Sequence, residues 1–171
     1  MLDPRPILVR QLAPADAPAF VVLRREALRD SPWAFAASEE SDVGLDPAFM
    51  GARLAEAGQA VVGAFEGERL VGVAGLVRNK HGKMAHRANV WGVYVTPAAR
   101  GRGVAEGIMR AVLDVARSWR GVNSVGLQVS SRAEGAKRLY LRLAFIEWGV
   151  EPGALMLDGA MYDEAHMVRM L

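Results

Sequence analysis

One segment of the chain, Trp91 to Ala105, constrains the fold more than any other. It reads W-G-V-Y-V-T-P-A-A-R-G-R-G-V-A, a run of β-forming residues that ends at Pro97, followed by a turn with two glycines and a helical pattern. The first amides of a helix lack intrahelical acceptors and attract anions, and glycines let a phosphate approach the backbone closely. Arg100 and Arg102 add positive charge. The segment therefore predicts a strand, a phosphate-binding turn and a helix.

Two other nucleotide-binding motifs use the same physics, and neither matches. A dinucleotide fingerprint needs a third glycine three residues after Gly103, where Glu106 stands, and Gly107 comes one place late. A P-loop would end in Gly-Lys-Ser/Thr, which does not occur. The remaining alternative is a Gly-rich, Arg-containing helix start that binds nothing, and the strand and proline ahead of the turn favour a ligand.

The rest of the chain alternates strand and helix patterns. Further β-forming runs occupy Ile7 to Leu12, Gln59 to Phe65, Leu70 to Arg78, Val125 to Val129, Phe145 to Val150 and Ala165 to Leu171. Helical patterns start at Asp16 as N-cap and at Asp46-Pro47, and span Val104 to Trp119 and Glu134 to Leu143. The turn Glu66 to Arg69 predicts an antiparallel hairpin. No linker or repeat divides the chain, so we expect one domain over residues 1–171.

Composition removes several classes of function. The chain is 51 % hydrophobic, enough to fill one core. It has no cysteine, which excludes disulfides and thiolate nucleophiles, and its 3 histidines lack metal-site spacing, so we expect no metal. A net charge of +2 argues against nucleic acid as a partner. Prolines interrupt the N-terminus, and no stretch is as long as a membrane span, so we expect a cytoplasmic protein without a membrane partner.

Two stretches in order resemble the GNAT N-acetyltransferase superfamily. Val93-Tyr94-Val95, Pro97 and Arg100 to Ala105 resemble its acyl-CoA signature, whose core is R-x-x-G-x-A. Leu127 to Val129, Ala136 to Tyr140 and Ala144-Phe145 resemble its second motif at the expected distance. The resemblance implies an α+β fold with one mixed, mostly antiparallel sheet of about seven strands flanked by about four helices. It also implies transfer of an acetyl group from acetyl-CoA to a primary amine.

The resemblance also assigns roles to residues. The main chain of Val93 and Val95 would hydrogen-bond the pantetheine arm. A β-bulge at Gly92 would splay the strand and free its polar groups for this role, and the alternative is that Gly92 only adjusts the twist of the strand. Tyr140 would protonate the departing thiolate, unless it is a core tyrosine. The pyrophosphate would be held by the backbone amides of Arg100, Gly101, Arg102, Gly103, Val104 and Ala105.

Three positions depart from the family pattern. Ala133 replaces a frequent asparagine, Ala144 replaces a frequent glycine, and Asn89 stands where some relatives carry a glutamate as general base. An amine must lose a proton before it attacks, so the base is left open. The candidates are a water chain held by Asn89 and Ser130, or a distant acceptor, His86 or Glu66.

Side-chain contacts outside these motifs are open as well. The 3′-phosphate could be reached by Lys137, Arg138 or Arg132. The acceptor amine should meet two acidic segments, Arg29 to Leu45, with Trp33 and Phe35, and the connection Glu151 to Glu164. The alternative is that the acidic side chains of these segments are ordinary solvated loop charges. A non-catalytic acyl-CoA sensor and a homodimer through the C-terminal strand also fit the sequence.

Overall fold

The strand patterns assemble into a single mixed sheet. In residues 6–171, which the computed structural model describes, seven strands follow the order β1-β2-β3-β4-β5-β7-β6. Their bounds are β1 Ile7–Gln11, β2 Gln59–Glu66, β3 Arg69–Arg78, β4 Arg87–Val95, β5 Ser124–Ser130, β6 Ile146–Leu157 and β7 Ala160–Met170. The expectation for the extreme N-terminus falls partly outside the described residues. The predicted fold class is confirmed.

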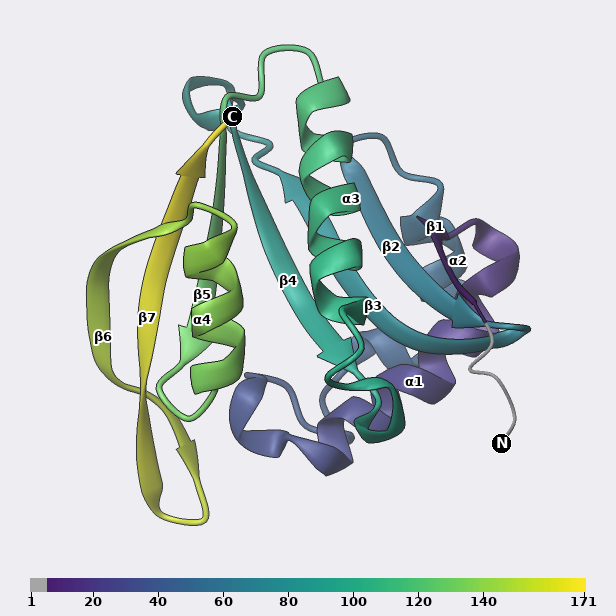
Figure 1. Ribbon diagram of the computed structural model, residues 1–171, viewed down its shortest axis with the longest axis horizontal. Coiled ribbons are helices and arrows are strands. Elements are labelled where there is room, and N and C mark those ends of the chain that lie inside the picture. Colours follow the sequence, from purple (N-terminus) through teal and green to yellow (C-terminus); the bar gives the residue numbers. More distant parts are fainter. Residues whose placement is uncertain (1–5) are drawn as a thin grey trace.

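Helices cover both faces of the sheet. Their bounds are α1 Ala17–Asp30, α2 Pro47–Leu54, α3 Val104–Ser118 and α4 Glu134–Arg142. The helices α3 and α4 lie on one face, and α1 and α2 lie behind it (Figure 1). Successive side chains of a strand point to opposite faces, so Val62 of β2 joins the α3–α4 core while Val61 joins the α1–α2 core. Burial on both faces explains why β2 and β3 read as unbroken apolar runs.

The pairing of β4 with its neighbours creates the opening that the site uses. Every neighbouring pair is antiparallel except β4 and β5, which pair in parallel only over Arg87 to Asn89. Beyond Asn89 the two strands diverge (Figure 1). On its other side β4 shifts register against β3, and Gly92 has a φ of +64°, as the predicted bulge requires.

One local expectation was wrong. The segment Glu151 to Glu164 is no loop, because β6 and β7 continue through it as a hairpin that turns at Asp158-Gly159, both with positive φ.

Asp16 is the N-cap residue of α1, as predicted, but its carboxylate makes no capping hydrogen bond to that helix and accepts hydrogen bonds from the Ala13 amide and Arg10. The carboxylate caps the preceding short turn instead.

Candidate active site

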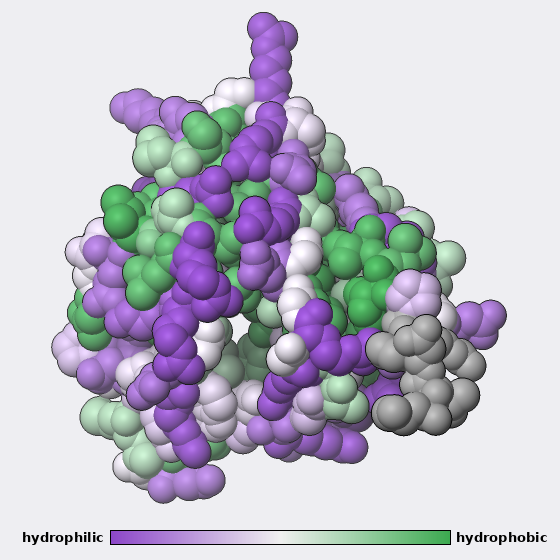
Figure 2. Space-filling model, viewed as in Figure 1, coloured by the Kyte–Doolittle hydropathy of each residue, from purple (hydrophilic) through white to green (hydrophobic). Residues whose placement is uncertain are grey.

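The turn before α3 forms one end of the candidate site. Gly101 and Gly103 have φ of +73° and +76°, a region that glycine enters without strain, and a Cβ built at either would meet no protein atom within 4 Å. The turn opens onto a cavity of about 360 Å³ between β4, α3 and α4. It is lined by Val95, Ala99, Arg100, Gly101, Gly103, Val104, Ala105, Glu106, Gly135, Leu139 and Arg142. Figure 2 shows this face hollowed between α4 and the start of α3.

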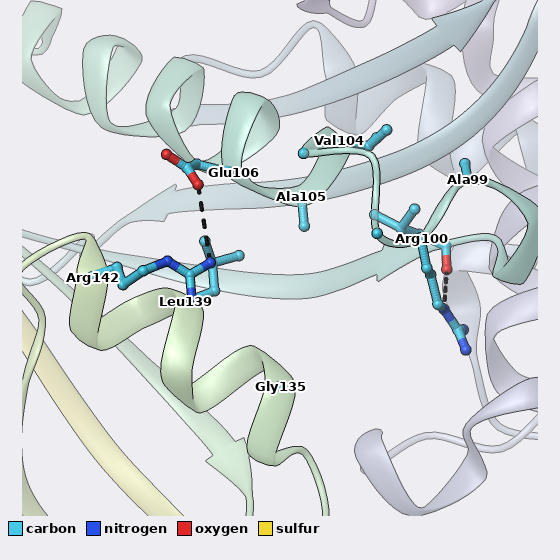
Figure 3. Close-up of a pocket in the computed structure, with 11 residues that line it drawn as sticks. Ala99, Arg100, Val104, Ala105, Glu106, Gly135, Leu139 and Arg142 are labelled. Atoms are coloured by element: carbon cyan, nitrogen blue, oxygen red, sulfur yellow. Dashed lines mark hydrogen bonds and ion pairs between the residues drawn. The ribbon is translucent and has the colours of Figure 1, made fainter. Parts of the chain in front are cut away.

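The arginine side chains of the turn are already engaged. Arg100 donates from Nε to the Val95 carbonyl at 2.9 Å, and its guanidinium forms an ion pair with Asp30. Figure 3 shows Arg100 folded back toward the strand. Arg102 donates to Glu66 at 2.8 Å. The positive character of the cavity therefore comes from the free amides of the α3 start more than from these two side chains.

Arg142 is a basic group at this cavity that sequence reasoning missed. It lies at the end of α4, 4.0 Å from Glu106 of α3 (Figure 3). Glu106 also binds Arg110 at 2.8 Å, so Arg142 shares a carboxylate with another cation. Arg142 is far from the turn in sequence, and no local pattern would have pointed to it.

The open edge of β4 leads away from the turn. The Thr96 amide donates to Val71 of β3, so the polar groups of Val95 point to the opposite side, where β5 has separated. By alternation, those of Val93 point the same way. The main-chain polar groups of Val93 and Val95 therefore lie along the gap between β4 and β5.

A narrow slot of about 90 Å³ continues the gap through the sheet. Val93, Ala136 and Tyr140 line it from the α3–α4 side, and Phe35 and Trp91 from the side of α1. Gln128 and Ser130 of β5 complete its wall. The slot is much smaller than the roughly 300–1,000 Å³ of a typical ligand site, so it admits only a small group.

Tyr140 lies at this slot with its ring in the core. The residue is 4 % exposed, and the Tyr140 and Phe145 ring centroids are 5.9 Å apart. Burial raises the pKa of the Tyr140 phenol well above its usual value of 10.0. The hydroxyl therefore stays protonated at neutral pH and can donate a proton or a hydrogen bond.

A third cavity, of about 610 Å³, lies on the α1 face and joins the two segments expected on the acceptor side. Trp33 and Phe35 line it together with Leu155 and Met156 of β6. Phe35 also lines the slot, so the two spaces adjoin. We name this space the acceptor-side cavity.

Most of the carboxylates expected to attract a cation there are engaged within the chain. Glu39 accepts from Arg29 at 2.5 Å, and Asp42 from Arg24 at 2.6 Å. Asp163 accepts the Gly153 amide at 2.8 Å. The general attraction of a cationic amine by loop charges is weaker than the sequence suggests.

The structure separates the candidate bases. Asn89 stands at the last paired position of β4, with Oδ1 2.9 Å from where a Cβ on Gly126 would lie. Glu66 is paired with Arg102 and His86 is exposed; neither lines the slot. Of the residues named as candidates for proton transfer, Ser130 lines it.

The candidates for the 3′-phosphate also have partners within the chain. Lys137 pairs with Glu147 at 2.5 Å, and Arg138 with Glu134 at 3.4 Å. Arg132 lies on the acceptor side, with its guanidinium 5.3 Å from the Trp33 ring centroid. Ala133 lines the slot, where an asparagine was expected from the family pattern.

Comparison with known proteins places the chain in a family. Residues 22–145 match the Acetyltransferase (GNAT) family. The chain is 30 % identical over 168 residues to an uncharacterized protein of Mycobacterium leprae, covering 98 % of this chain and 41 % of that protein. It is 30 % identical over 160 residues to N-alpha-acetyltransferase RimI of Mycobacterium tuberculosis, covering 92 % and 90 %.

A solved structure agrees with this assignment. The structure of yncA from Salmonella typhimurium with its cofactor acetyl-CoA aligns with a TM-score of 0.81 at 20 % identity, covering 96 % of this chain and 93 % of that one. The chain thus belongs to the GNAT acetyltransferase family, which confirms the family and the enzyme class expected from the sequence. It spans about two fifths, 41 %, of the length of the Mycobacterium leprae relative.

Within residues 6–171, no group of three or more His, Asp or Glu side chains is placed to hold a metal ion. No helix in this part of the chain is long and apolar enough to cross a bilayer.

Proposed function

We propose that the protein transfers the acetyl group of acetyl-CoA to a primary amine by direct attack, without a covalent enzyme intermediate. The observation that carries the proposal is the continuous path from the open α3 start, along the free edge of β4, to the slot beside Tyr140. Such a path can accommodate, in this order, the phosphate end of acetyl-CoA, its extended pantetheine arm and its small acetyl group.

The chain's own residues divide the work along this path. The amides from Arg100 to Ala105 bind the pyrophosphate, because the α3 start offers donors and a favourable dipole. The main chain of Val93 and Val95 orients the pantetheine arm. Tyr140 holds the proton that the departing thiolate takes up, which typically contributes ~10²–10⁴-fold to the rate. Phe35 and Trp33 shield the acceptor from water.

Replacement of Tyr140 tests the chemical part. Tyr140→Phe keeps the buried ring and removes the hydroxyl, so kcat should fall by roughly 10²-fold or more while the Kd for CoA changes little. Thiol release would be measured with a panel of amines: a peptide with a free N-terminus, lysine and spermidine. Phe145→Leu, a change to the neighbouring ring, is the control for packing. Unchanged turnover in Tyr140→Phe would remove the phenol from the mechanism.

A non-catalytic acyl-CoA sensor is the second candidate, and Asn89 in place of a base favours it. The same panel separates the two. Binding of CoA by calorimetry without thiol release from acetyl-CoA on any amine would support the sensor.

A further inference from the structure

Glu164 of β7 occupies the position from which a base could serve the slot. Resting on the proposed acetyl transfer, we propose that Glu164 is the general base that deprotonates the acceptor ammonium. Glu164 lies on β7, whereas Asn89, which cannot accept a proton, lies on β4. Glu164 is also distinct from the two distant acceptors considered above, His86 and Glu66. It reaches the site through the pairing of β5 with β7.

The register brings Glu164 beside the slot. Glu164 lies directly opposite Ser130 in the antiparallel β5–β7 pair, and Ser130 lines the slot with Tyr140. Opposed residues of such a pair have Cβ atoms about 4.5–5.5 Å apart and share a face. Their neighbours Val129 and Ala165 face the α3–α4 core, so Ser130 and Glu164 face the acceptor side.

The same face connects Glu164 to the acceptor-side cavity. Tyr162 lies two residues earlier on β7, and its cross-strand partner Leu155 lines that cavity. Arg132 donates to the Tyr162 hydroxyl at 3.4 Å and stacks over Trp33. Glu164 itself lines neither space, but it lies on the strand face between Ser130, which lines the slot, and Tyr162, whose cross-strand partner lines the acceptor-side cavity.

The surroundings of Glu164 suit a proton acceptor. The charged and titratable groups on the strands beside it are Glu151 on β6, His166 and Tyr162 on β7, and Arg132 after β5. Burial raises the pKa of the Glu164 carboxyl, and Glu151 raises it further, while His166 opposes them. A carboxylate with a raised pKa is a stronger base than one free in water.

A route to solvent begins at the same cluster. His166 Nε2 lies 3.1 Å from Glu151 Oε2, and the Glu151 side chain is 58 % exposed. Glu151 lies directly opposite Glu164 in the β6–β7 pair, so the strand pairing beside Glu164 leads to a solvent-exposed carboxylate on the side away from the slot.

The reaction balances with these groups. One N–H bond of the ammonium breaks, directly or through one water, and its proton goes to Glu164 and on to solvent. The freed lone pair attacks the thioester carbonyl, so a C–N bond forms and the C–S bond breaks. The thiolate takes the Tyr140 proton, and the second proton that the nitrogen loses restores the Tyr140 phenol, so the products are the amide, the CoA thiol and one proton released to solvent.

The test compares Glu164→Gln with Asp163→Asn. The control changes the adjacent residue, which points to the opposite face and can still accept the Gly153 amide. The kcat/KM would be measured against pH with the fastest amine of the panel and with hydroxylamine, which is already neutral at pH 7. We expect Glu164→Gln to lose roughly 10²-fold with the alkyl amine, to lose the acid limb of its pH profile, and to lose much less with hydroxylamine.

Folding is checked separately. Because the folded-state pKa of Glu164 is raised above the unfolded one, its ionisation lowers the stability as the pH rises from the unfolded pKa, and fully above the folded pKa, so Glu164→Gln should melt no lower than wild type at pH 8. Equal losses with both acceptors, or an unchanged pH profile, would overturn the inference while the acetyltransferase stands. A wild type that binds CoA but acetylates no amine would overturn the proposed function and this inference with it.

Discussion

At the scale of single residues, the ion pair of Arg24 with Asp42 is largely buried and lies close to the site. The Arg24 side chain is 11 % exposed and the Asp42 side chain 9 %, and they meet at 2.6 Å. The guanidinium stacks 4.6 Å from the Phe35 ring centroid, and its Nη1 is buried without a hydrogen-bond partner. Asp42 also accepts the Gly44 amide at 2.7 Å. The pair therefore ties α1 to the segment that carries Phe35.

Asp42→Asn should be strongly destabilising. The amide oxygen can still accept from Gly44, but its NH2 group then faces Arg24 Nε, so the change removes both the charge and the acceptor of Arg24 and leaves the largely buried guanidinium without a counter-ion. Breaking a buried pair costs about 3–5 kcal/mol, which urea unfolding would measure. Glu39→Gln, at the more exposed pair with Arg29, should cost no more than about 1 kcal/mol. Equal effects of the two changes would contradict the importance of burial here.

At the scale of elements, the strand-to-helix junction carries the proposed cofactor site. Gly103 is the N-cap of α3 in a left-handed conformation, and Gly101 is also left-handed two residues earlier. This geometry points successive amides at the cavity. The junction works only because β4 has already lost β5 as a neighbour, which leaves its last residues free.

Gly103→Ala should weaken CoA binding. An L-residue in the left-handed region costs roughly 1–2 kcal/mol. If the turn relaxes to avoid that strain, its amides lose their alignment and the Kd should rise roughly tenfold. Calorimetry with CoA measures the change. Gly82→Ala is the matched control, because Gly82 has open space around it and no positive φ. An unchanged Kd in Gly103→Ala would mean that the turn does not hold the pyrophosphate.

At the scale of the whole molecule, the proposed ligand path connects parts of the chain that lie on opposite faces of the sheet. The path touches β4, α3 and α4 on one face and reaches the segment before α2 on the other. Binding that contacts so many elements stabilises the folded state over the unfolded chain, which has no such site.

CoA should therefore raise the melting temperature. At a hundredfold excess over Kd the stabilisation is about 2.7 kcal/mol, which corresponds to roughly 5–10 °C for a chain of this size. Differential scanning fluorimetry measures the shift, and Gly103→Ala should shift less at the same concentration. No shift at millimolar CoA would count against the cofactor site.

Local chemistry by itself determined much of this protein. Apolar periodicity marked the helices and strands, and the glycines and proline of Trp91 to Ala105 marked the turn before α3, because strand, turn and helix signals depend on near neighbours. Local sequence patterns did not predict that β6 and β7 continue into a hairpin. The strands shift register near Gly153, and the polar residues there have the pattern of a loop.

Only the tertiary structure decided which side chains meet. Arg142 reaches the cavity of the turn from α4, and Glu164 faces Ser130 through the β5–β7 register. The tertiary structure also shows that Arg100 and Arg102, which the sequence suggests are free cations, are paired with Asp30 and Glu66. Such contacts depend on strand order and register, which join residues far apart in the chain and leave no trace in its local pattern.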